Sequence, residues 1–180
     1  MPFTDVLSTN WFFNDVKWAV ENQYMNGVSA KEFAPNTAVT QAMIVTILGR
    51  MAKVDTQQFS ASSYPDIQGG KWYTEFAVWA RQSGLLPAAA DFAGGAPISR
   101  NDMAVMLVKY LRVMGKSLTA PAQPAAFADA EQMTREGRDA FQLLYANDIF
   151  KGVGGGRMDP AGSTTRAQFC ALIRRLAAQG

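Results

Sequence analysis

An internal repeat constrains this chain more than any other feature of its sequence. Each of three copies opens with an aromatic residue two positions before an aspartate, and the openings recur at intervals of roughly 60 residues. They are Phe3 with Asp5, Tyr64 with Asp66, and Phe127 with Asp129. We expect the copies to span residues 1–60, 61–122 and 123–180. Because a unit of this length with two short helices buries little surface by itself, the copies should share one core in a compact module.

The second half of each copy predicts an amphipathic helix that begins after a hydroxyl residue. Thr40, Ser99 and Thr165 stand at equivalent positions and are suitable N-caps. Ser99 with Asp102 and Thr165 with Gln168 also have the spacing of a capping box. Apolar residues follow each cap after four, seven, eight and eleven positions, which is one face of a helix. They are Ile44, Ile47, Leu48 and Met51; Met103, Met106, Leu107 and Tyr110; Phe169, Leu172, Ile173 and Leu176.

A shorter amphipathic helix is expected earlier in each copy, and Trp11 and Trp72 precede it in the first two. This helix runs out near Gln23, Gly84 and Asp148. A left-handed residue commonly closes a helix, and glycine adopts that conformation most readily, so Gly84 suits the position best.

Two helices per copy predict an all-α fold. An open solenoid of helical hairpins is one arrangement of such repeats. Neither end of this chain reads as a polar capping repeat, so we favour a closed, three-pronged helical bundle with pseudo-three-fold symmetry.

The composition excludes several classes of function. The chain has no histidine and one cysteine, Cys170, so it lacks Ser-His and Cys-His nucleophiles and the usual zinc, copper and iron–sulfur ligand sets. No glycosidase pair stands out among its carboxylates, and the glycine run at 152–156 lacks the lysine and hydroxyl of a phosphate-binding loop. A formal charge of +2 provides no field for nucleic acid, and no apolar stretch approaches the ~20 residues of a membrane span. We therefore expect no catalytic activity, metal, cofactor, nucleic-acid partner or membrane insertion.

The repeat resembles the S-layer homology family, whose unit runs from an aromatic-x-Asp opening, through a helix and a glycine-containing turn, to a Thr-Arg-Ala-Glu segment. Three segments of this chain, in register with the other landmarks, carry the resemblance. They are Thr165-Arg166-Ala167-Gln168, Ser99-Arg100-Asn101-Asp102 and Thr40-Gln41-Ala42-Met43. The resemblance implies a three-pronged pseudo-trimer that binds a secondary cell-wall polymer, often bearing a pyruvylated amino sugar, in the grooves between its prongs.

Arg100 and Arg166 are the ligand-binding residues that the resemblance favours most. Each follows its N-cap directly, where a guanidinium and the positive end of the helix dipole would meet the carboxylate of a pyruvyl ketal. Gln41 supplies no charge at the equivalent position, so we expect one or two functional grooves. Alternatively, these arginines brace a neighbouring prong by pairing with a carboxylate such as Asp66 or Asp129.

Glycines and tryptophans complete the candidate site. Gly27, Gly84 and Gly152 lie in the turn after the first helix, where bare backbone would approach a sugar closely. Trp11 and Trp72 would offer apolar faces to a pyranose ring, or would instead staple the helix that follows to the core. The aspartates Asp5, Asp66 and Asp129 are expected to pin the repeat openings rather than touch ligand.

The expected function is non-covalent binding of an anionic, pyruvylated wall polysaccharide, which anchors an attached protein to the bacterial cell surface. The chain would be a monomeric module within a larger secreted protein, located in the cell wall or S-layer, with its export signal elsewhere in that protein. The alternative is that degenerate repeats serve as a protein–protein assembly module in a surface layer.

Overall fold

The computed structural model describes residues 1–59, 64–87 and 91–179. These residues form six α-helices and two short 3-10 helices, Thr56–Phe59 and Ala130–Gln132, with no strand longer than an isolated bridge. The all-α prediction is therefore confirmed. The helices are α1 (Phe13–Glu21), α2 (Gln41–Met51), α3 (Thr74–Gln82), α4 (Arg100–Val113), α5 (Arg135–Ala146) and α6 (Arg166–Ala177).

The predicted N-caps begin α2, α4 and α6, the second helix of each copy. We call these the long helices and the first helices, α1, α3 and α5, the short helices, although α5 and α6 both have 12 residues. Thr40, Ser99 and Thr165 each accept a hydrogen bond from the backbone N–H three residues later. Only Thr165 completes a capping box, because the Gln168 side chain reaches back to its backbone N–H at 2.9 Å. The shorter carboxylate of Asp102 instead accepts from the Ser99 hydroxyl at 2.8 Å.

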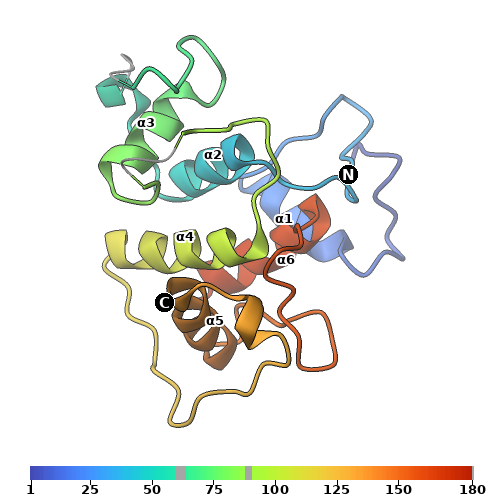
Figure 1. Ribbon diagram of the computed structural model, residues 1–180. Helices are drawn as coiled ribbons and strands as arrows, with labels where there is room; N and C mark the ends of the chain where they lie inside the picture. The colour runs from blue at the N-terminus through green and yellow to red at the C-terminus, as the bar shows by residue number, and fades with distance from the viewer. Residues whose placement is uncertain (60–63, 88–90, 180) are drawn as a thin grey trace.

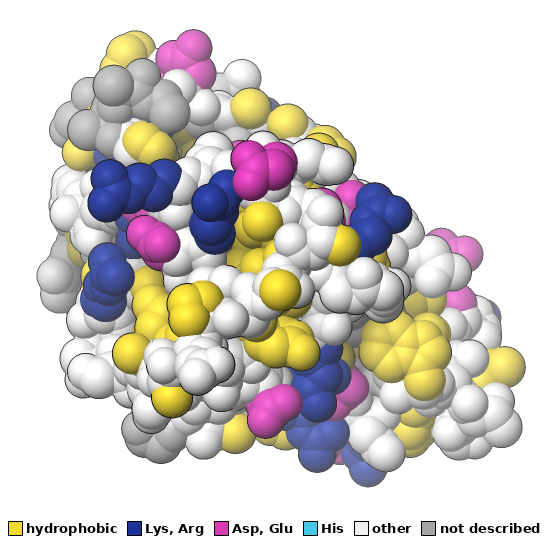
Figure 2. Space-filling model, turned by 60° about the horizontal axis from the view of Figure 1, so that its bottom comes forward, with side chains coloured by type: hydrophobic (Ala, Val, Ile, Leu, Met, Phe, Trp, Pro, Cys, Tyr) yellow, Lys and Arg dark blue, Asp and Glu magenta, His cyan; other side chains and the backbone are white. Residues whose placement is uncertain are grey.

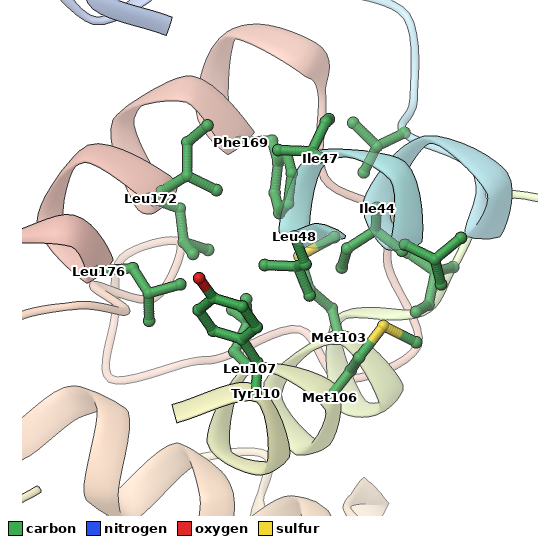
Figure 3. Packing of buried hydrophobic residues seen from close by; sticks show 14 of the residues in the cluster. Ile44, Ile47, Leu48, Met103, Met106, Leu107, Tyr110, Phe169, Leu172 and Leu176 are labelled. Atoms are coloured by element: carbon green, nitrogen blue, oxygen red, sulfur yellow. The ribbon is translucent and has the colours of Figure 1, made fainter. Parts of the chain in front are cut away.

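The apolar faces of α2, α4 and α6 meet at the centre of the molecule. Figure 3 shows side chains from all three helices pointing toward one another, with Leu48, Leu107 and Leu172 among them. Every residue predicted for these faces is buried except Met51, which is half-buried. Repetition of one helical face in the sequence thus correctly predicted the shared core.

The shorter helices pack against long helices of a neighbouring copy. Helix α3 packs on α2, α5 on α4, and α1 on α6, so each prong takes one helix from each of two copies (Figure 1). The packing of α1 on α6 joins the beginning of the chain to its end and includes an ion pair of 2.9 Å between Asp15 and Arg174. This contact closes the ring of prongs and excludes the open solenoid.

The three short helices end on residues with left-handed backbone, as expected. The φ angles are 60° at Gln23, 76° at Gly84 and 56° at Asp148. Each helix is followed by a turn that lies on the molecular surface, and these turns contribute to the grooves described below.

Closure of the ring makes the stability of α6 depend on α1. Val16 of α1 is fully buried, so Val16→Ala should lower the free energy of unfolding by about 2 kcal/mol. Urea unfolding should remain a single transition, and amide exchange should quicken in α6 as well as in α1. Faster exchange confined to α1 would indicate a frayed end and contradict closure.

Candidate functional site

Three surface grooves repeat at equivalent positions around the module. Each is lined by the turn after a short helix and by the long helix of the same copy. The first residue of the long helix of a second copy also lines each groove. The remaining copy contributes a residue that lies just before or at the start of its short helix. We name each groove after the copy that supplies its turn, residues 24–28, 85–87 or 149–153. The first-copy and second-copy grooves have volumes of about 390 Å³, and the third-copy groove of about 310 Å³.

Two grooves bring together most of the residues predicted from the sequence. Arg166, Trp72 and Gly27 line the first-copy groove. Arg100, Trp11 and Gly152 line the third-copy groove at the equivalent places. In each groove the arginine, the tryptophan and the glycine come from three different copies, so the site exists only in the assembled module.

The second-copy groove has a different character. Gln41 takes the place of the arginine, and Thr134 lies where the other grooves have a tryptophan. Its lining contains three carboxylates, and one of them, Glu136, pairs with Lys109 at 3.3 Å. The described linings of the other two grooves contain arginine or lysine but no aspartate or glutamate. Only these two grooves therefore present an uncompensated positive charge.

Arg166 bridges the third copy to the first. It is 5% exposed, and its Nε and Nη2 atoms donate to the carbonyls of Phe33 at 2.8 Å and Asn26 at 2.6 Å. Its guanidinium also lies over the Phe33 ring, 4.4 Å from the centroid. Burial lowers the pKa of Arg166 below its ordinary value, although nearby Cys170 and Asp5 oppose this effect.

Arg100 bridges the second copy to the third in the same way. It is 5% exposed, its Nε donates to the Met158 carbonyl at 2.7 Å, and its guanidinium lies 4.5 Å from the Phe150 centroid. Among the described residues Nη2 has no hydrogen-bond partner. The alternative role for these arginines is thus partly right, because both brace a neighbouring copy. Their partners are backbone carbonyls, however, and neither forms an ion pair with the suggested carboxylates.

The first three backbone N–H groups of each long helix are used within the protein. The third N–H bonds to the cap, and the first two donate to carbonyls of another copy at 2.8–3.1 Å. The donors and acceptors are Gln41 and Ala42 to Ala96 and Gly94, Arg100 and Asn101 to Gly162 and Pro160, and Arg166 and Ala167 to Thr37 and Pro35. Since none of these nine N–H groups remains for an anion, the positive groups of the grooves are side chains.

The tryptophans are surface residues and do not staple their helices. Trp11 is 66% exposed and Trp72 58% exposed. Each lies edge-on to the next aromatic residue along the chain, Phe12 or Tyr73, at a centroid distance of 5.3 Å. Phe12 is buried, and the Tyr73 ring packs on Phe92, so these neighbours anchor the helices and leave the tryptophans free to face a ligand.

The three candidate glycines occupy two kinds of position. A Cβ on Gly27 would overlap Phe3, and one on Gly152 would lie 2.6 Å from the Arg157 carbonyl, so both are required for the fold of their turns. Gly84 instead ends α3 and lines none of the grooves. The second copy's counterpart of Gly27, residue 88, lies outside the described residues.

The opening aspartates pin the loop that precedes each long helix. Asp129 accepts from the N–H groups of Met158 at 3.1 Å and Asp159 at 2.8 Å. Asp5 and Asp66 hold the equivalent loop positions. Burial raises the pKa of Asp129, but the backbone donors outweigh this effect and lower it below its ordinary value.

A second basic position in the grooves was missed in the sequence. Arg50, Lys109 and Arg175 line the three grooves, each ten residues after its N-cap. The regular spacing was available in the sequence, but only apolar residues were compared there. Arg81 of the second copy was also missed. It donates to Asp66 at 2.7 Å, and its guanidinium lies over the Tyr64 ring. The loop of this copy is the one that the uncharged Gln41 contacts.

The part of the chain that the structure describes contains no metal-binding cluster, no membrane-spanning helix and no reactive thiolate. Within it no three histidine, cysteine, aspartate or glutamate residues are placed to hold a metal ion. None of the described helices has the length and hydropathy needed to cross a bilayer. Cys170 is fully buried beside Met25, and burial raises its pKa to about 12, so the thiolate is not formed at neutral pH.

Fold and grooves together define a closed helical repeat module with ligand-sized clefts between its copies. A family model described as the S-layer homology domain matches residues 2–42 and 126–170, which cover most of the first and third copies. The first and third copies thus each contain a segment that matches the S-layer homology domain. The middle copy lies outside the matched residues, but it has the same two helices, cap and aspartate pin in the structure.

Curated relatives are similar to this chain over a small part of their own length. They are an endoglucanase of Bacillus sp. strain KSM-635 (27% identical, 97% of this chain, 18% of the relative), an amylopullulanase of Thermoanaerobacterium thermosulfurigenes (20%, 95% and 9%) and a surface-layer 125 kDa protein of Lysinibacillus sphaericus (29%, 61% and 10%). Because so little of each enzyme is matched, their names assign no catalysis to this chain. The two S-layer homology segments and the surface-layer relative indicate a cell-surface module that serves in cell-wall anchoring.

The aspartate pins make stability depend on pH in the acid range. A carboxylate whose pKa is lowered by folding stabilises the protein above its unfolded pKa, and this contribution is lost as the pH falls below about 4. Asp129→Asn should lower the free energy of unfolding at pH 7 by about 1–3 kcal/mol, because its amide N–H₂ would face a backbone N–H. Urea unfolding between pH 2.5 and 7 should also show a weaker pH dependence than in the parent. An unchanged pH profile would contradict the pin.

Proposed function

We propose that the module binds an anionic secondary cell-wall polysaccharide non-covalently in its first-copy and third-copy grooves. A pyruvyl ketal on the polymer would place its carboxylate at Arg166 in one groove and at Arg100 in the other. Binding would hold a larger attached protein on the cell surface. The observation that carries the proposal is the charge of the linings. The described linings of these two grooves contain basic residues and no carboxylate, whereas the second-copy groove contains three carboxylates.

The groove geometry suits an acidic sugar. The arginine is held rigidly by the carbonyl bonds and the aromatic ring described above, so little side-chain entropy is lost when it binds a carboxylate. An exposed tryptophan in the lining of the same groove offers an apolar face to the C–H groups of a pyranose ring. Charge and apolar contact together distinguish an acidic saccharide from a simple anion.

The face of the module supports recognition within grooves rather than over a broad surface. Figure 2 shows basic and acidic side chains interspersed on one face, with separate apolar patches between them. This pattern gives no extended field of one sign. With two basic grooves on one module, binding of both to a single polymer chain would add avidity.

Attachment of a larger protein is supported by the relatives. The matched region is 18%, 9% and 10% of their lengths, so in each of them a similar segment belongs to a much longer protein. The names of two relatives describe polysaccharide-degrading enzymes and that of the third a surface-layer protein.

The test is calorimetric titration of the intact module with purified pyruvylated wall polysaccharide. Substitution of either arginine by alanine would break a bridge between copies, so the test uses Arg100→Lys and Arg166→Lys, which keep the charge but lose the planar pair of donors. Each should lower the affinity of its groove by about tenfold, and the double variant should lose most binding.

Two controls make the result specific. Arg112→Lys changes an exposed arginine of α4 outside the three grooves and should bind as the parent does. Polymer whose ketals have been removed should bind at least tenfold more weakly. Equal binding of both polymers would contradict the role of pyruvate. No binding, together with concentration-dependent self-association in sedimentation, would favour the assembly alternative.

A further inference from the structure

The first-copy groove contains a buried hydroxyl with nothing to bind in the protein. Thr46 of α2 is 1% exposed and lines this groove, and its Oγ1 atom has no hydrogen-bond partner among the described residues. The equivalent positions of the other grooves hold Val105 and Ala171, which have no polar side-chain atom. Thr46 is therefore a local departure from the pattern and not a requirement of the fold.

An unpartnered buried hydroxyl is unfavourable for stability. It loses its hydrogen bonds to water on folding, and a threonine in a helix usually recovers one by donating to the carbonyl four residues earlier. Thr46 makes no such bond. The same space would accept valine, which has nearly the same shape without the hydroxyl. The observation calls for a partner that is supplied from the groove.

Arg50 lies one helical turn beyond Thr46, on the same face of α2 and in the same groove. Its Nη1 atom donates to the Tyr24 carbonyl at 3.1 Å, and its other nitrogens have no hydrogen-bond partner among the described residues. Arg166 holds the same turn from the other side, through the Asn26 carbonyl. Two guanidinium groups of the groove lining thus hold the turn that contains Tyr24 and Asn26.

We propose that Thr46 and Arg50 form a second polar subsite in the first-copy groove, which binds an uncharged oxygen of an acidic saccharide. The inference rests on the proposed function, in which Arg166 binds the acid group of the same sugar unit. Arg50 only donates hydrogen bonds, so the ligand atom that it contacts is an acceptor, such as a hydroxyl or N-acyl carbonyl oxygen. Thr46 both donates and accepts, so it suits a neighbouring hydroxyl or the same carbonyl.

The subsite makes the two basic grooves unequal. The third-copy groove has Arg175 where the first-copy groove has Arg50, but Ala171 in place of Thr46. It therefore lacks the hydroxyl and should discriminate less between sugars that differ in an uncharged substituent, because a buried polar group left unpaired is what penalises the wrong ligand.

The experiment isolates the first-copy groove by using the Arg100→Lys variant as the background. In calorimetric titration with the pyruvylated polysaccharide, Thr46→Val should weaken binding about tenfold, and Thr46→Ser, which keeps the hydroxyl, should stay within about twofold of the background. Arg50→Met should also weaken binding about tenfold. Thr119→Val, at an exposed threonine outside the grooves, is the matched control and should change nothing.

Thermal unfolding separates a binding role from a structural one. Because Thr46→Val removes an unpartnered buried hydroxyl, it should leave the melting temperature unchanged or raise it by a few degrees while binding is lost. A fall in both melting temperature and affinity would overturn the subsite, since the hydroxyl would then have a structural partner.

The outcomes also separate this inference from the proposed function. Binding that depends on Arg166 but is insensitive to Thr46→Val and Arg50→Met would overturn the subsite and leave the proposed function intact. Absence of binding by the unmodified module would overturn both.

Discussion

The structure depends on the way each long helix satisfies its first backbone N–H groups. A helix leaves its first four N–H groups without partners inside the helix, and such groups are costly to bury unpaired. Here a cap residue supplies one partner, and a loop of another copy supplies two more for each of α2, α4 and α6. Since each helix uses a loop from another copy, no copy satisfies the start of its own long helix. The bonds from α6 to Pro35 and Thr37 of the first copy also join the end of the chain to its beginning, beside the packing of α1 on α6.

The arginine bridges extend this arrangement to the side chains. The side chain of the residue directly after each cap contacts the neighbouring copy that accepts the backbone bonds. The same residue lines a groove. The ring beneath the guanidinium differs between grooves: Phe33 supports Arg166, whereas Phe150 supports Arg100 and the position equivalent to Phe33 is Met158. An aromatic and a methionine have exchanged places between copies, and the guanidinium is held at about the same height over the ring.

The sequence predicted what periodicity and caps determine, and little that depends on contacts between copies. The three long helices, their N-caps, their buried faces and the aspartate pins were predictable, because each is encoded within about 30 residues. An amphipathic pattern shows that a face is buried but not against which helix, so the exchange of short helices between copies was not visible. Nor were the carbonyl partners of Arg166, which lie 133 and 140 residues away. The role of the tryptophans depended on which of two adjacent aromatic residues enters the core, and sequence spacing does not distinguish them.

The first copy shows that bracing and charge are separable functions of the same position. Gln41 keeps a contact with the next loop by accepting from the Ala93 N–H at 3.2 Å, and Arg81 supplies a guanidinium to the Asp66 pin from α3. The first copy is therefore held in the ring without an arginine after its cap, Thr40. Because the fold tolerates glutamine there, structure alone does not require a cation at the start of α4 or α6. The positive charge of Arg100 and Arg166 thus needs a separate explanation, and an anionic ligand in the two grooves that they line provides one.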